Sequence, residues 1–110
     1  MDITTLQDKV RELDKKKPII YQLNTQREKE ILTKTIKLNE EVGELCNDTL
    51  SVLKLQRKSK LENFDKRNFY EEFADVIITT VQLANAAGVD IERAINDKLA
   101  KIEHRYSKDK

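Results

Sequence analysis

The chain has 110 residues, the length of one small domain, and contains no Pro- or Gly-rich stretch that would indicate a linker. Its 21 Lys and Arg residues nearly balance its 20 Asp and Glu residues, which argues against a general nucleic-acid-binding protein, since such proteins usually carry a basic excess. There is a single cysteine, Cys46, with no signal-like start and no apolar run of membrane-spanning length. We therefore expect a soluble, cytoplasmic protein.

The composition favours helices over sheets. The chain contains only 2 Gly, 1 Pro, 3 Phe and 3 Tyr residues and no Trp, whereas sheets usually need more turn residues and more aromatic side chains. Hydrophobic residues make up 38% of the chain and charged residues 37%, a low apolar content for a small domain that must fill its own core. We predict a single all-α domain, a four-helix bundle whose core is completed by oligomerisation.

Four helices are predicted in chain order, separated by recognisable stop and start signals. They cover about residues 4–16, 26–57, 69–87 and 91–106. Pro18 ends the first helix, because the residue before a proline is pushed out of the helical region. Thr25 and Glu28 have the spacing of a capping box, which starts the second helix.

The second half of the chain has its own boundary signals. The charged stretch 58–67 is predicted to be a loop, and Asn68 follows it as the N-cap of the third helix. Gly88 is placed to end that helix, and Asp90 to cap the fourth. The domain then divides into an N-terminal helix and connection (1–24), a helical core (25–106) and a frayed tail (107–110).

Two acidic pairs stand out, each with its carboxylates three residues apart. Glu41 and Glu44 lie in the second predicted helix, and Glu72 and Asp75 lie in the third. At about 100° per residue, each pair projects from one face of its helix, at the edge of an apolar stripe. If the two stripes pack antiparallel, the four carboxylates converge, and a hard divalent cation with oxygen ligands would relieve their repulsion. Mg²⁺, with Mn²⁺ as the alternative, suits such a site and can bridge phosphate oxygens.

The fourth predicted helix carries a complementary basic face. Lys98, Lys101 and Arg105 share one side of it, beside an apolar stripe that ends at Tyr106. Cations beside an acidic metal site would bind the polyphosphate oxygens that the metal does not cover. The acidic and basic faces also have a plainer explanation, because a chain with 37% charged residues forms solvated charged faces by chance. Geometry alone leaves both explanations open.

The sequence contains too few suitable residues for other metal sites, for a phosphate-binding loop or for a cysteine nucleophile. His104 is the only histidine and no Glu-x-x-His motif occurs, so neither a di-iron bundle nor a zinc site is indicated. Gly43 and Gly88 are too isolated to form a phosphate-binding loop. Cys46 has no histidine nearby in sequence, which favours a buried structural thiol over a nucleophile.

The runs LNEEVGEL (38–45) and EEFADV (71–76), followed by Lys98 and the pair Arg105-Tyr106, resemble the MazG-like all-α nucleoside triphosphate pyrophosphohydrolases. That family's signature is Glu-x-x-Glu followed, after a variable loop, by Glu-x-x-Asp. The resemblance covers about residues 26–106. It implies a house-cleaning hydrolase that uses Mg²⁺ to cleave a (deoxy)nucleoside triphosphate to the monophosphate and pyrophosphate. It also implies a MazG-like bundle assembled as a homodimer or a dimer of dimers.

The resemblance assigns roles to individual residues. The metal ligands and catalytic residues would be Glu41, Glu44, Glu72 and Asp75. The phosphate-binding residues would be Lys98, Lys101, Arg105 and Tyr106. The chain departs from several relatives in having Ile102 where they carry Asn, and in lacking their base-stacking Trp residues. Candidate base contacts are therefore sought among Tyr21, Phe64 and Tyr70.

Two other functions stay open. One is a non-catalytic helical module that binds a nucleotide or regulates a partner. The other is phosphoribosyl-ATP pyrophosphatase, whose family shares a similar acidic helix. The intact set of four carboxylates argues against the inert module, and the Glu-Val-Gly-Glu and Glu-Phe-Ala-Asp pairs fit the MazG-like group better.

Overall fold

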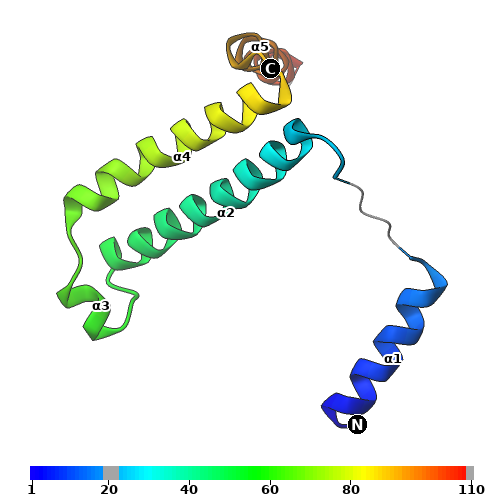
Figure 1. Ribbon diagram of the computed structural model, residues 1–110. Helices are drawn as coiled ribbons and strands as arrows, with labels where there is room; N and C mark the ends of the chain where they lie inside the picture. Colours follow the sequence, from blue (N-terminus) through cyan, green and yellow to red (C-terminus); the bar gives the residue numbers. More distant parts are fainter. Residues whose placement is uncertain (19–22, 109–110) are drawn as a thin grey trace.

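The computed structural model describes residues 1–18 and 23–108, and these residues form helices and connections without any strand (Figure 1). The helices are α1 (Ile3–Lys16), α2 (Gln26–Val52), α3 (Lys58–Glu62), α4 (Lys66–Ala87) and α5 (Ile91–Lys108). The prediction of an all-α fold is confirmed. None of the described helices combines the length and apolar character needed to cross a bilayer.

Three of the predicted boundary signals work as expected. In the capping box the Glu28 N–H donates to Thr25 Oγ1 (3.1 Å), and the Thr25 N–H donates back to Glu28 Oε1 (3.0 Å). Gly88 ends α4 in the left-handed region, at φ 72°. Asp90 Oδ1 accepts a hydrogen bond from the Arg93 N–H (3.1 Å) at the start of α5.

The predicted loop at 58–67 is wrong in part. It contains the short helix α3, and α4 begins before residue 69 because Asp65, not Asn68, is its N-cap. The Asp65 carboxylate accepts a hydrogen bond from the Arg67 N–H at 2.9 Å. A single turn of helix without a side-chain cap leaves no periodic signal in the sequence, which is why α3 was not predicted.

Other helix ends also differ from the prediction. α2 stops at Val52, earlier than expected, because Lys54 takes a left-handed φ of 60° and turns the chain away. α1 starts at Ile3, slightly before the predicted start, because Asp2 caps it: Asp2 Oδ1 accepts from the Thr5 N–H at 2.8 Å. α5 continues through Ser107, so the predicted tail is partly helical.

α2 and α4 run antiparallel side by side, and theirs is the only extensive interface between helices in the described part of the chain (Figure 1). The less exposed positions on each helix recur at alternating steps of three and four. On α2 they include Ile31, Lys34, Leu38, Glu41, Leu45 and Asp48, and on α4 Phe69, Glu72, Val76, Thr79 and Leu83. This is the spacing of a coiled-coil seam, and we call these positions the seam.

Arg27 closes the end of the hairpin that is far from α3. Its Nε donates to the Ala86 carbonyl (3.2 Å) and its Nη2 to the Ala87 carbonyl (3.0 Å). The last carbonyls of a helix lack partners within the helix, and the helix dipole favours a cation beside them. A Cβ at Gly88 would stand 3.4 Å from the same Nη2, so the left-handed turn and the guanidinium fit together closely.

α1 and α5 form no comparable interface with the hairpin. Ala84 is the one apolar side chain that is buried among the described residues. The radius of gyration is 20.6 Å, whereas a compact domain of this length would have about 13 Å. A single chain therefore presents a two-helix hairpin with further helices outside it. Completion of a four-helix bundle by oligomerisation stays a prediction.

Candidate metal centre

Glu41 occupies a seam position of α2 that an apolar side chain would ordinarily fill. It is only 9% exposed, and its Oε2 is buried without a hydrogen-bond partner among the described residues. Its other oxygen, Oε1, lies 3.4 Å from Lys37 Nζ, one turn earlier on the helix. Leaving a buried acceptor unsatisfied costs about 1–3 kcal/mol, and more when the group is charged. Glu41 Oε2 therefore lacks the hydrogen-bond donor or cation that a buried carboxylate oxygen needs.

Glu72, on the facing helix, also has a buried oxygen without a partner among the described residues. It sits in the seam of α4, and the buried oxygen is its Oε2. Burial raises the pKa of Glu72 above its usual range, and repulsion from Glu44, Asp48, Asp75 and Glu41 raises it further. Four negative side chains therefore surround this carboxylate.

The structure brings Glu41, Glu72 and Asp75 together across the hairpin. One carboxylate oxygen from each lies within 4.8 Å of the other two. Glu41 is buried, Glu72 half-buried and Asp75 exposed, so the cluster opens to solvent on one side. Several carboxylate oxygens with access to water match the needs of Mg²⁺, which takes oxygen ligands and keeps some of its waters. The donor set fits a hard divalent cation.

Two more carboxylates lie at the margin of this cluster. Glu44 is exposed and outside the group of three, yet close enough to raise the pKa of Glu72. Asp48 acts on Glu72 in the same way from a half-buried seam position, and the sequence analysis did not single it out as a site residue. The spacing from Glu41 through Leu45 to Asp48 could have identified Asp48, because these three residues have the spacing of a coiled-coil seam.

Nearby hydroxyl groups do not relieve the acidic cluster. Thr79 is only 5% exposed, but its Oγ1 donates to the Asp75 carbonyl in its own helix (2.7 Å). Thr80 does the same with the Val76 carbonyl (2.7 Å). Such bonds to the preceding turn use the only proton that each hydroxyl can donate. The buried oxygens of the cluster therefore remain without donors from these residues.

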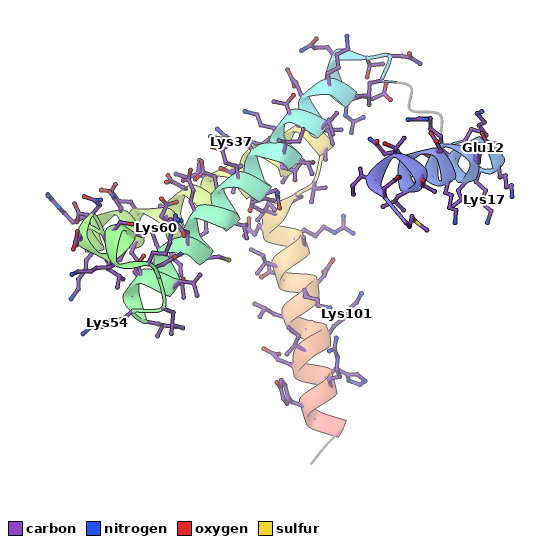
Figure 2. The ribbon with its side chains drawn as sticks, turned by 90° about the horizontal axis from the view of Figure 1, so that it is seen from below. Glu12, Lys17, Lys37, Lys54, Lys60 and Lys101 are labelled. Atoms are coloured by element: carbon purple, nitrogen blue, oxygen red, sulfur yellow. The ribbon has the colours of Figure 1, made fainter. Side chains whose placement is uncertain are left out.

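The predicted phosphate-binding residues lie elsewhere in the single chain. Lys98, Lys101, Arg105 and Tyr106 are all on α5. Figure 2 shows this helix leaving the hairpin at a steep angle, with Lys101 far from Lys37 on α2. The cation that does lie at the cluster is Lys37, whose Nζ is 3.2 Å from Glu40 Oε1 and 3.4 Å from Glu41 Oε1.

The candidate base contacts and Cys46 differ in how far they are exposed. Phe64 is half-buried beside α3, whereas Tyr70 is 81% exposed. Tyr21 lies outside the described residues. Cys46 is exposed, so its prediction as a buried thiol is wrong. It follows Leu45 on α2 and therefore falls outside the seam.

Comparison with known families gives one match. The model of the MazG-like family matches residues 32–110, a stretch that contains both acidic pairs, α3, α4 and α5. Neither the curated proteins nor the solved structures include a match to this chain.

Proposed function

We propose that this chain, which belongs to the MazG-like family, is a metal-dependent enzyme that cleaves a (deoxy)nucleoside triphosphate to the monophosphate and pyrophosphate. Family membership supports nucleotide pyrophosphohydrolase activity in general. The observation that carries the specific proposal is the pair of buried, unpartnered oxygens, Glu41 Oε2 and Glu72 Oε2, in one carboxylate cluster. A packing role alone gives no reason to bury them.

The proposed cofactor is Mg²⁺, with Mn²⁺ as the alternative. Glu41, Glu72 and Asp75 already converge, and Glu44 would join them from the helical turn after Glu41. A bound divalent cation would neutralise phosphate charge and lower the pKa of a bound water.

The protein side chains then have defined tasks. Glu41 and Glu72 hold fixed positions because they are part of a packed seam between two helices, so the site changes little when substrate arrives. The water oxygen bonds to the α-phosphorus, the bond to the α–β bridging oxygen breaks, and pyrophosphate leaves. The released proton can reach solvent on the side where Asp75 is exposed.

A triphosphate would meet several carboxylates here and needs cationic side chains as well. We propose that the chain works as a homodimer or a dimer of dimers, in which α5 covers an acidic cluster with Lys98, Lys101, Arg105 and Tyr106. The apolar stripe of α5 supports this, because Ile95 is 52% and Leu99 51% exposed in the single chain. We propose neither nucleic acid nor a membrane as a partner.

The test is pyrophosphate release from a panel of ribo- and deoxyribonucleoside triphosphates and phosphoribosyl-ATP, with and without Mg²⁺. Glu41→Gln and Glu72→Gln keep the side-chain shape and remove the charge. Each should lower kcat/KM by about 100-fold or more, since a metal contributes several kcal/mol of transition-state stabilisation.

Glu71→Gln is the matched control, because Glu71 is the exposed neighbour of Glu72 and lies outside the group of three carboxylates. It should retain nearly full activity. Full activity in both the Glu41 and the Glu72 variant would contradict the assignment. Cleavage of phosphoribosyl-ATP alone would replace the house-cleaning function with that of a phosphoribosyl-ATP pyrophosphatase.

A further inference from the structure

A polar cavity lies next to the acidic cluster, at the end of the hairpin where α3 joins α2 and α4. Its volume is about 310 Å³, which is within the range of small-molecule sites. The lining side chains that matter below are Asp48, Lys60, Asn63, Phe64, Asp65 and Asn68. Phe64, a candidate base contact from the sequence, is the one lining residue that has been given a binding role so far.

Asp48 connects the cavity to the candidate metal centre. Asp48 lines the cavity, and its negative charge also repels Glu72. On α2 it lies two turns beyond Glu41, about 10 Å along the axis at 1.5 Å per residue. A ligand whose phosphates lie at the cluster therefore has an adjoining space for its other end.

The cavity offers both donors and acceptors. Asn63 Nδ2 donates to the Ser59 carbonyl (2.9 Å), which leaves its Oδ1 free to accept. Asn68 is exposed in the lining, and its side-chain amide can both donate and accept hydrogen bonds. Lys60 Nζ donates to Asn47 Oδ1 (3.3 Å) and has further protons to give. Such a mixture matches the edge of a nucleobase.

The walls are held in place before any ligand arrives. Asn47 on α2 accepts hydrogen bonds through Oδ1 from Gln56 Nε2 and from Lys60 Nζ, which fixes α3 against α2. Phe64 is half-buried and lines the cavity, so it supplies an aromatic surface on which a base can stack. Figure 2 shows Lys60 at this end of the hairpin, remote from α5.

Charge decides which part of the substrate fits. Asp48 and Asp65 outnumber Lys60 among the charged residues of the lining, so a phosphate group is disfavoured. An uncharged nucleoside is not repelled by these carboxylates. Lys60 can only donate hydrogen bonds, so it favours a base that presents a carbonyl oxygen at its edge, as guanine O6 and uracil O4 do, over adenine, which presents the N6 amine donor at that position and only ring nitrogens as acceptors.

We propose that this cavity binds the nucleoside end of the triphosphate, and that Lys60, Asn63 and Asn68 determine the base preference, with oxo bases preferred to adenine. The inference rests on the proposed function for its substrate class. It assigns no residue to the chemical step. Lys60, Asn63 and Asn68 act as specificity residues only.

The first test compares kcat/KM for pyrophosphate release from GTP, UTP, CTP and ATP. Lys60→Met and Asn68→Ala should change the ratio of oxo-base substrates to ATP by about tenfold or more, because a site built to hydrogen-bond its substrate loses that discrimination with the bond. Lys58→Met, on the same short helix outside the lining, and Asn96→Ala on α5 are matched controls and should leave the ratios unchanged. Unchanged ratios in both test variants would overturn the inference.

The second test does not depend on catalysis. Guanosine and adenosine, which carry no phosphate, are titrated into the protein while the side-chain amide signals of Asn63 and Asn68 are followed by NMR. Guanosine should shift both signals, adenosine should shift them less, and Lys60→Met should remove the difference. Base-dependent shifts without any pyrophosphate release would contradict the proposed function but support base recognition in this cavity. Pyrophosphate release, with shifts that are the same for guanosine and adenosine, would support the proposed function and contradict base recognition in this cavity.

Discussion

The α2–α4 hairpin and α5 differ in where they place charged and apolar side chains. In the hairpin, carboxylates occupy seam positions that packing would fill with apolar side chains, as Glu41 and Glu72 show. On α5 the apolar stripe is regular, but Leu99 is 51% and Tyr106 68% exposed. One region buries charge and the other exposes apolar surface. Each is unfavourable in a single free chain.

The two irregularities support two separate parts of the proposed function. Buried carboxylates without donors indicate a cation, whereas an uncovered apolar stripe indicates another protein surface. α1 resembles α5 in this respect, since Ile3 is 70% and Leu13 62% exposed. The hairpin therefore supplies the candidate chemistry, and the outer helices supply the candidate assembly.

The assembly should fail when the α5 stripe is charged. Leu99→Asp places a carboxylate in that stripe, so we expect dissociation to monomers and loss of most pyrophosphate release, because the basic residues of α5 would no longer cover an acidic cluster. Light scattering coupled to size-exclusion chromatography measures the first and an activity assay the second. Arg93→Asp on the opposite, exposed face is the control. A wild-type chain that is an active monomer at micromolar concentration would contradict this prediction.

Metal and charge neutralisation should stabilise the hairpin in the same way. Mg²⁺ should raise the Tm of the wild type, because the cation relieves repulsion among Glu41, Glu72 and Asp75. Glu72→Gln should raise the Tm of the metal-free protein by several degrees, about what 1 kcal/mol gives in a small domain. The variant should then gain less from Mg²⁺. A lower Tm of the metal-free variant would show that the Glu72 charge stabilises the fold.

The same carboxylate gives a pH dependence with a defined sign. Burial and neighbouring carboxylates raise the pKa of Glu72 in the folded state, so the folded protein holds this proton more tightly than the unfolded chain. Without metal, the Glu72 contribution to stability is present at acid pH and is lost as pH rises through the folded pKa. The stability gap between Glu72→Gln and wild type should therefore close as pH falls from 7 toward about 4–5, the usual carboxylate range. Urea unfolding across this range measures the gap.

The smallest effect is expected where α2 ends. Lys54 adopts φ 60°, a left-handed conformation that costs a residue with a Cβ about 1 kcal/mol. Lys54→Gly should stabilise the chain by about 0.5–1 kcal/mol without changing activity, while Lys58→Gly inside α3 should destabilise it by a similar amount. Chemical denaturation of both variants distinguishes strain at this position from a general tolerance of glycine.

The sequence predicted the class of fold and the pairing of carboxylates, because both depend on local spacing. On α2 it located the seam only in part. The apolar pattern predicts a stripe of Leu38, Val42, Leu45 and Leu53. Leu38 and Leu45 do lie in the seam, but Val42 and Leu53 are 39% and 60% exposed, while Glu41 and Ser51 are buried. Hydrophobicity cannot find a seam whose positions are occupied by charged residues, and local rules are most often broken at functional sites.

Other features lay beyond local reasoning. The cavity at α3 arises from contacts of Asn47 with Gln56 and Lys60, residues nine and thirteen positions apart along the chain. No periodic pattern encodes such contacts. The position of α5 cannot follow from the sequence either, because within one chain it has no packing partner of comparable extent in the described residues.

Whether the cluster of Glu41, Glu72 and Asp75 drives metal-dependent cleavage between the α- and β-phosphates can be measured directly by ³¹P NMR. The phosphorus signals of a preferred nucleoside triphosphate are followed in the presence of the wild-type protein. With Mg²⁺ the spectra should show only nucleoside monophosphate and pyrophosphate as products, and chelation of the metal or Glu41→Gln should abolish both. Release of a nucleoside diphosphate with inorganic phosphate, or turnover that persists without a divalent cation, would contradict the account.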